Sequence, residues 1–172
     1  MSQTEYNIRN PEALDDMGME QTPVVLTRWV TFTVADEVYA LNVLDVQEVL
    51  RAAEITPIPG AHPAIRGIIN LRGNVVTILD ARVFFSLPEK PFDDDSRIMV
   101  VELRTGEVAG IVVDSVAEVI TLDEDDVNDA KRTSNDEGSE HILGVVPQSS
   151  DKGNDKLIIL VDLKGLSDLS TK

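Results

Sequence analysis

Ten short apolar runs, each bounded by residues that favour turns, are the feature that most constrains the fold of this chain. Valine and isoleucine dominate the runs, and their branched Cβ atoms suit a pleated sheet better than a helix. The runs are residues 28–35, 38–43, 54–59, 65–71, 75–80, 97–103, 108–114, 116–122, 141–146 and 156–163. Short strands at this spacing, with glycine-containing turns, favour small barrels or a sandwich over a parallel βαβ sheet. We therefore predict a mainly β fold.

Short helices are expected at three places between the runs. Residues 42–51 can gather their apolar side chains on one helical face, with Asn42 as the cap. Those side chains are Val43, Val46, Val49 and Leu50, and Gln47 and Glu48 would point outward. The other two helices are expected after Asp80 and Asp162, because an aspartate before a helix accepts hydrogen bonds from the first free amide groups.

Two pairs of similar segments predict a duplicated architecture. Residues 78–85 resemble residues 160–166, and the aspartates Asp80 and Asp162 lie 82 positions apart. A weaker echo joins residues 69–78 to residues 101–111. We predict one structured region over 28–168, in which a first subdomain covers roughly 38–92, a second covers roughly 96–160, and the terminal segments pack across.

Acidic residues outnumber basic ones by 31 to 15, which gives a formal net charge of −16. Such a chain is repelled by phosphate backbones, so nucleic acid is not an expected partner. The charge is dense in residues 1–27, for which we expect a disordered tail, and in residues 122–140, for which we expect a surface loop. No apolar run is long enough to cross a membrane and no signal peptide is evident, which predicts a cytoplasmic protein without direct membrane insertion.

Catalytic and metal-binding patterns are absent from the sequence. The chain has no cysteine and two histidines, His62 and His141, and neither histidine lies in a catalytic motif. The carboxylates of residues 93–95 and 123–126 lack the spacing of a calcium-binding loop. We therefore predict that the protein is not an enzyme and uses neither a metal nor a cofactor.

The segment from Gly67 to Val76 carries the clearest candidate for recognition. Its two apolar strands are joined at a tight turn, where Gly73 and Asn74 are expected to supply the positive φ angles. Arg72 then lies at the tip of a hairpin. An arginine there either solubilises the turn or binds a partner's carboxylate, and the pattern leaves both interpretations open.

At these residues the chain resembles the CheW family, the coupling proteins of bacterial chemotaxis. The similarity covers Trp29 to Leu166 and is carried by V-Q-E-V (46–49), G-I-I-N-L-R-G-N-V (67–75), G-I-V-V-D-S-V (110–116) and L-I-I-L-V-D-L (157–163). The family departs from this chain at Thr77 and Ala81, where many members have proline and leucine. Nothing specific matches residues 1–27 or 122–140.

The resemblance implies two Src-homology-3-like five-stranded barrels on a shared core, and no catalytic activity. It implies an adaptor that joins chemoreceptors to the CheW-like regulatory domain of the histidine kinase CheA, monomeric outside the receptor array. The receptor-binding residues that it implies are Arg72, Val46 and Gly67, with Ile111 and Val112 as apolar contacts. Glu48 and Val43 are implied at the kinase contact.

Two other functions remain open at this point. An adaptor of a pilus-type or other chemosensory pathway would bind a similar kinase but different receptors. A small-ligand-binding β-barrel would instead be stabilised by a saturating small molecule.

Overall fold

The computed structural model describes residues 23–51, 54–103, 105–133, 142–148 and 156–163 of the 172-residue chain. Its strands are β2 (Leu26–Val34), β3 (Glu37–Asn42), β4 (Val46–Arg51), β5 (Ile65–Leu71), β6 (Asn74–Asp80), β7 (Arg97–Glu102), β8 (Val108–Val113), β9 (Ser115–Asp123), β10 (Ile142–Gln148) and β11 (Lys156–Val161). Its helices are the 3-10 turn η2 (Val43–Asp45), α1 (Ala81–Phe84) and α2 (Glu124–Thr133). The predicted mainly β fold is confirmed.

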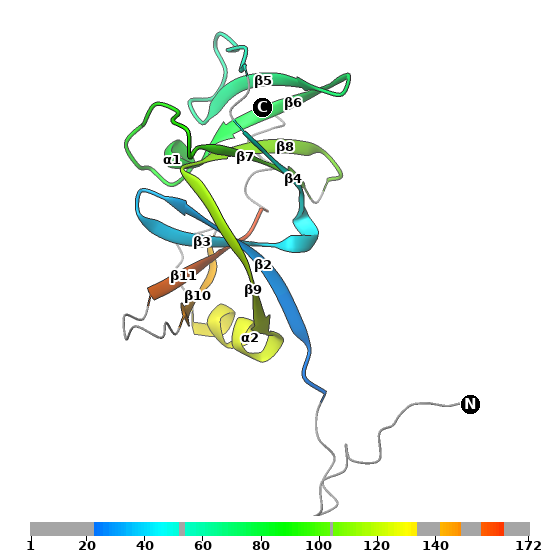
Figure 1. Cartoon of the computed structure of the whole chain (residues 1–172), viewed down its shortest axis with the longest axis vertical. Coiled ribbons are helices and arrows are strands. Elements are labelled where there is room, and N and C mark those ends of the chain that lie inside the picture. Colours follow the sequence, from blue (N-terminus) through cyan, green and yellow to red (C-terminus); the bar gives the residue numbers. More distant parts are fainter. Residues whose placement is uncertain (1–22, 52–53, 104, 134–141, 149–155, 164–172) are drawn as a thin grey trace, which may run out of the picture.

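The strands form two five-stranded sheets that lie one above the other in Figure 1. The terminal sheet contains the first and last of the described strands, β2 and β11, and has the order β10-β11-β3-β2-β9. The central sheet has the order β4-β7-β8-β6-β5. Each sheet contains one parallel pair, β11 with β3 and β6 with β8, and its other neighbours are antiparallel.

The two sheets repeat one pairing pattern. Strands β4 to β8 match β9, β10, β11, β2 and β3 in that order. The central unit is therefore continuous in the sequence, whereas the terminal unit is assembled from the beginning and the end of the described chain. Asp80 is the last residue of β6, and Asp162 directly follows the matched strand β11, which accounts for their similar surroundings in the sequence. The echo between residues 69–78 and 101–111 instead joins two hairpins of the central sheet, so it does not reflect the duplication.

The sheets do not follow the predicted division of the chain. Residues 46–113 supply the whole central sheet, and the terminal sheet takes its strands from both sides of that segment. The predicted subdomains 38–92 and 96–160 therefore each contribute strands to both sheets. Of the predicted tail, residues 1–22 lie outside the described residues, and β2 begins at Leu26.

The helix predicted for residues 42–51 is wrong. Asn42 does cap a turn, since its Oδ1 accepts a hydrogen bond from the Leu44 amide (2.9 Å), but η2 ends at Asp45 and the strand β4 follows. Burial alternates along β4 with a period of two. The half-buried positions are Val46, Glu48 and Leu50, and the exposed ones are Gln47, Val49 and Arg51. Antiparallel pairing with β7 decides the conformation of a segment whose valines also fit a helical period.

The predicted helix after Asp80 is confirmed. The Asp80 Oδ1 accepts a hydrogen bond from the Arg82 amide (2.9 Å) at the start of α1. The helix predicted after Asp162 would lie beyond residue 163, outside the described residues. The strand predicted at 54–59 is reduced to one bridge, between Thr56 and Ile68.

The loop predicted for residues 122–140 is wrong over residues 124–133, which form α2. Val127 and Ala130 lie one turn apart, are 4 % and 5 % exposed, and pack with the buried side chains of the terminal sheet. Acidic residues occupy the first turn and basic residues the last, as the helix dipole favours. Residues 134–141 lie outside the described part of the chain.

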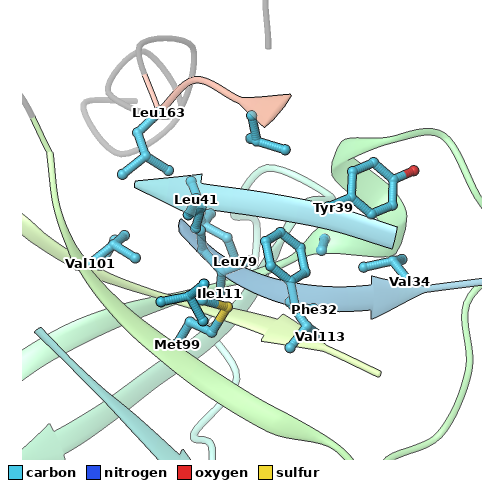
Figure 2. Packing of buried hydrophobic residues seen from close by; sticks show 14 of the residues in the cluster. Phe32, Val34, Tyr39, Leu41, Leu79, Met99, Val101, Ile111, Val113 and Leu163 are labelled. Carbon is cyan, nitrogen blue, oxygen red and sulfur yellow. The ribbon is translucent and has the colours of Figure 1, made fainter. Parts of the chain in front are cut away.

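One hydrophobic cluster joins the two sheets (Figure 2). From the terminal sheet it takes Val30, Phe32, Val34, Tyr39, Leu41 and Val161, and from the central sheet Leu79, Met99, Val101, Ala109, Ile111 and Val113. Two smaller clusters belong to single sheets, one packed with α2 and one on the central sheet. The contact between the sheets is therefore apolar over most of its described extent.

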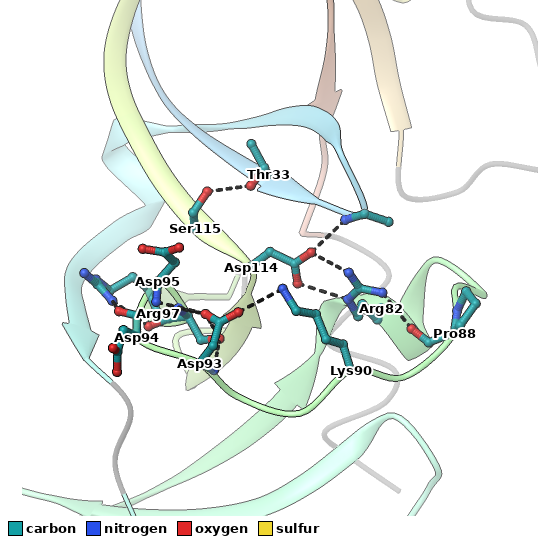
Figure 3. A network of polar contacts seen from close by, with 12 residues as sticks. Thr33, Arg82, Pro88, Lys90, Asp93, Asp94, Asp95, Arg97, Asp114 and Ser115 are labelled. Carbon is teal, nitrogen blue, oxygen red and sulfur yellow. Dashed lines mark hydrogen bonds and ion pairs between the residues drawn. The ribbon is translucent and has the colours of Figure 1, made fainter.

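A polar network lies at the edge of this apolar contact (Figure 3). Asp114 separates β8 of the central sheet from β9 of the terminal sheet. Its carboxylate accepts two hydrogen bonds from Arg82, from Nε (3.0 Å) and Nη2 (2.6 Å), and one from the Ala35 amide (2.8 Å). Burial alone would raise the pKa of Asp114, but these hydrogen bonds outweigh it and hold the pKa below its ordinary value of 3.8.

Acid should therefore weaken the fold through Asp114. A group whose pKa is lowered by folding stabilises the protein above its unfolded-state pKa, and this stabilisation is lost as the pH falls through the folded-state pKa. We expect Asp114→Asn to lower the free energy of unfolding by about 1–3 kcal/mol at pH 7. The difference from wild type should shrink below about pH 4. Urea unfolding at several pH values measures it, and a difference that does not change with pH would contradict the assignment.

Candidate functional site

Arg72 lies at the tip of the β5–β6 hairpin, as predicted. Leu71 pairs with Asn74, so Arg72 and Gly73 are the two central residues of the turn. Their φ angles are 53° and 86°, which is the combination that a type I′ hairpin turn requires. The positive φ angles thus belong to Arg72 and Gly73, not to Gly73 and Asn74. The Asn70 Oδ1 fixes the turn by accepting a hydrogen bond from the Gly73 amide (2.9 Å).

The guanidinium of Arg72 forms a two-pronged ion pair with Glu48. Its Nη1 and Nη2 donate to Oε2 and Oε1 of the carboxylate, each at 2.7 Å. The Arg72 side chain is 69 % exposed and that of Glu48 is 24 % exposed. The hydrogen bonds from Arg72 lower the pKa of Glu48, and those to Glu48 raise the pKa of Arg72. The pair is therefore fully charged at neutral pH, and its paired geometry orients a side chain that would otherwise move freely.

This ion pair connects the two edges of the central sheet. Glu48 belongs to β4 at one edge, and Arg72 follows β5 at the other. Their contact requires the sheet to curl until its edges approach each other, as in a small barrel. The residue predicted for the kinase contact and the residue predicted for the receptor contact are thus brought together, 24 positions apart in the sequence.

A hollow of about 470 Å³ opens beside Arg72. Val75, Val76 and Val108 contribute apolar surface to its walls, and Val75 is 67 % exposed. The other lining residues are Gln47, Leu71, Arg72, Asn74, Thr77 and Glu107. A charged side chain at the rim and apolar surface within can accept a partner that presents both kinds of group.

Val46 and Val43 are half-buried and pack against the cluster that joins the sheets. Val46 precedes Glu48 on β4, and Val43 lines a second pocket of about 360 Å³. Leu26 and Leu44 line the same pocket and are 61 % and 89 % exposed. The two predicted valines therefore support neighbouring surface and present little of their own.

Ile111 and Val112 are buried, each 6 % exposed, in the interior strand β8. They belong to the hydrophobic clusters on the two faces of the central sheet. A direct contact with a partner needs exposed atoms, so we leave these two residues out of the proposed surface.

Gly67 lies on β5, where its backbone packs closely against Thr56. Its φ is 146°, and a Cβ added to it would lie 2.2 Å from the carbonyl oxygen of Thr56. The amide and carbonyl of Thr56 are hydrogen-bonded to Ile68, both at 2.9 Å. Only glycine lets the segment around Thr56 lie this close to β5. Gly67 thus acts on the backbone that carries the hairpin.

Two exposed apolar residues beside the site, Val75 and Leu44, were not predicted. Val75 had a usable signal, since it alternates with the buried Val76 and must face outward on a strand. Leu44 had no such signal, because the predicted helix over residues 42–51 concealed that it lies in an exposed turn.

Within the described ranges, none of the helices has the length and apolar character that a membrane crossing needs. The same residues contain no cluster of three or more potential metal-ligating side chains.

Comparisons with known proteins match most of the chain. A family model for the CheW-like domain matches residues 28–170. The chemotaxis protein CheW of Bacillus subtilis is 31 % identical over 82 % of this chain and 86 % of its own length. Protein FrzA of Myxococcus xanthus is 34 % identical over 71 % and 73 %. The crystal structure of the scaffolding protein TtCheW from Thermoanaerobacter tengcongensis has a TM-score of 0.71 and 32 % identity, covering 86 % of this chain and 97 % of that one.

The fold defines a β domain built from two duplicated units, with an exposed ion pair at the tip of one hairpin. The match over residues 28–170 narrows this class to one family. The chain belongs to the CheW family.

Proposed function

We propose that this chain is a non-enzymatic chemotaxis adaptor that couples chemoreceptors to the histidine kinase CheA. Its membership of the CheW family supports the adaptor role, as do relatives named chemotaxis proteins and a solved neighbour named a scaffolding protein. The observation that carries the proposal is the ion pair of Glu48 and Arg72, because it joins the residue expected at the kinase to the residue expected at the receptor.

On the receptor side, Arg72 and the adjacent hollow form the proposed contact. A helical hairpin would place an apolar side chain against Val75 and Val108 and a carboxylate or helix-end carbonyl near Arg72. A guanidinium has five N–H donors, and the pair with Glu48 uses two of them. Arg72 can therefore bind a receptor group without leaving Glu48.

On the kinase side, Glu48 and the surface above Val43 form the proposed contact. Leu44 presents almost its whole side chain to solvent beside the pocket that Val43 lines. A partner that covers an exposed leucine gains the free energy of removing apolar surface from water. Glu48 would supply the charged rim of this contact, where a basic group of the partner can approach it.

We place the adaptor in the cytoplasm, as a monomer that receptors recruit to the membrane array. Individual contacts of such an adaptor gain apparent affinity when many of them are linked in one assembly.

Reconstitution tests the proposal. Receptor-bearing membranes and CheA are mixed with and without this protein, and kinase autophosphorylation is followed. We expect activation to require the protein and to fall when attractant is added. Arg72→Ala should weaken receptor binding by about 5- to 150-fold, and Glu48→Ala should weaken CheA binding.

Arg132→Ala is the matched control, since Arg132 is a similarly exposed arginine in an ion pair on α2. It should leave both affinities unchanged. Normal receptor affinity in a folded Arg72→Ala protein would contradict the role of Arg72. A protein that neither binds CheA nor activates it would overturn the coupling function.

A second candidate is an adaptor of another chemosensory pathway. The similarity to protein FrzA, whose name differs from that of the CheW relatives, favours keeping it. CheA-type kinase binding without activation by the tested receptors would support this candidate.

A further inference from the structure

Of the two described connections between the sheets, the one from β8 to β9 is the shorter. β8 ends at Val113 and β9 begins at Ser115, so Asp114 alone separates a strand of the central sheet from a strand of the terminal sheet. The Asp114 amide donates to the Thr33 carbonyl (3.0 Å), and the hydroxyls of Thr33 and Ser115 are hydrogen-bonded (Figure 3). The joint is therefore tied to Thr33 of β2 through the Asp114 amide and the Ser115 side chain.

The Asp114 carboxylate binds groups that belong to different sheets. Arg82 comes from α1, directly after β6 of the central sheet, and it also donates to the Pro88 carbonyl (2.9 Å). Ala35 comes from the turn between β2 and β3 of the terminal sheet. The Arg82 and Asp114 side chains are 14 % and 19 % exposed, so water competes little for these hydrogen bonds.

The turn that Asp114 holds is itself strained. Ala35 and Asp36 have φ angles of 51° and 69°, a region that side chains with a Cβ atom disfavour. The hydrogen bond to the Ala35 amide compensates for part of this strain. Because the turn joins β2 to β3, its position fixes where these two strands meet the central sheet.

The apolar contact between the sheets defines their angle less sharply than a directional contact does. Burial of apolar surface, here of side chains such as Val34, Leu79 and Val113, is non-directional in itself. A planar guanidinium bound to a carboxylate through two hydrogen bonds is directional, and it tolerates little rotation.

We propose that Arg82 and Asp114 form an orientation clamp that fixes the angle between the two sheets through the Ala35 turn. The ion pair of Glu48 and Arg72 lies on the central sheet, and the pocket of Leu26 and Leu44 is lined partly by β2 of the terminal sheet. The clamp therefore keeps these two surfaces in one relative orientation. This inference goes beyond the proposed function and does not depend on which partners bind.

Distance measurements between spin labels test the clamp in the protein alone. The chain contains no cysteine, so Val49→Cys on β4 and Thr121→Cys on β9 place one label on each sheet. Both positions are exposed and lie within paired strands. We expect a single narrow distance distribution in the otherwise unchanged chain. Asp114→Asn should broaden or shift it, because the side-chain NH2 replaces one of the two oxygens that accept from Arg82 and leaves two donor groups facing each other.

Arg82→Lys separates geometry from charge, since lysine keeps the positive charge but cannot form the two-pronged contact. We expect the distribution to broaden in this variant too. Arg132→Lys is the matched control, because Arg132 pairs with Asp129 on the exposed face of α2 and should leave the distribution unchanged.

An unchanged distribution in both folded clamp variants would overturn the proposal. If Asp114→Asn does not fold, Arg82→Lys decides the question. Loss of folding in both variants would also overturn the proposal, since the contact would then be needed for the fold and not for its orientation. Equal broadening in Arg132→Lys would show that no specific clamp exists.

Discussion

Replacing Gly67 with alanine should lower the free energy of unfolding by about 3 kcal/mol or more. The new Cβ would lie 2.2 Å from the carbonyl oxygen and 2.7 Å from the carbonyl carbon of Thr56, and the backbone φ of 146° is unfavourable for alanine. Relief requires the segment around Thr56 to move away from β5, which breaks its two hydrogen bonds with Ile68. Denaturant unfolding of both proteins measures the difference.

Gly60→Ala is the control for the backbone conformation alone. Gly60 has a φ of 79°, and a Cβ there would meet nothing within 4 Å. Its replacement should therefore cost only about 1–2 kcal/mol. Equal losses in the two variants would show that the contact with Thr56 is not what requires glycine at position 67. Weak receptor binding by Gly67→Ala, with stability unchanged, would instead show that Gly67 contacts the receptor directly.

Local turn chemistry was the part of the site that the sequence predicted best. The tip at Arg72 and the capping of α1 by Asp80 follow from short-range rules about glycine and aspartate, and the structure confirms both positions. The mainly β fold and the duplication also follow from patterns that survive in a single sequence. The boundary between the units could not be predicted, because in the terminal sheet strands from the two ends of the described chain pair with each other.

The secondary structure was predicted wrongly where the apolar residues fit both a helical and a strand period, or were too few to show either. Val46, Val49 and Leu50 fit a helix, yet pairing with β7 makes them a strand. Among the α2 side chains whose burial the structure describes, Val127 and Ala130 are the buried ones, and two apolar residues in ten are too few to reveal a helix inside an acidic segment. Ile111 and Val112 show the related limit that a sequence motif does not distinguish a buried strand from an exposed one.

The contact between Glu48 and Arg72 was beyond sequence reasoning for a geometric reason. Each residue was singled out separately, one as an outward-facing carboxylate and one as a hairpin tip. Their meeting depends on how far the central sheet curls, which is a property of all five strands. The pairing raises a question that the motifs do not: whether each residue contacts a partner, or the ion pair only holds the hairpin in place.

Exchanging the two charges should answer it. Arg72→Glu places two carboxylates where an ion pair stood, and we expect it to weaken receptor binding by about 30- to 150-fold. Glu48→Arg should weaken CheA binding in the same way. The double variant, Glu48→Arg with Arg72→Glu, restores opposite charges and with them the link between the sheet edges. If both residues contact partners, binding should stay within about threefold of the single variants.

Calorimetric titration with a receptor signalling fragment and with the CheA regulatory domain measures both affinities. The amide resonance of Gly73 reports whether the hairpin regains its geometry, because that amide donates to Asn70 within the turn. The same exchange at Asp129 and Arg132, an exposed pair on α2, is the control and should leave both affinities unchanged. Recovery of both affinities in the double variant would assign the ion pair a purely structural role, because the partners would then be indifferent to the sign of either charge.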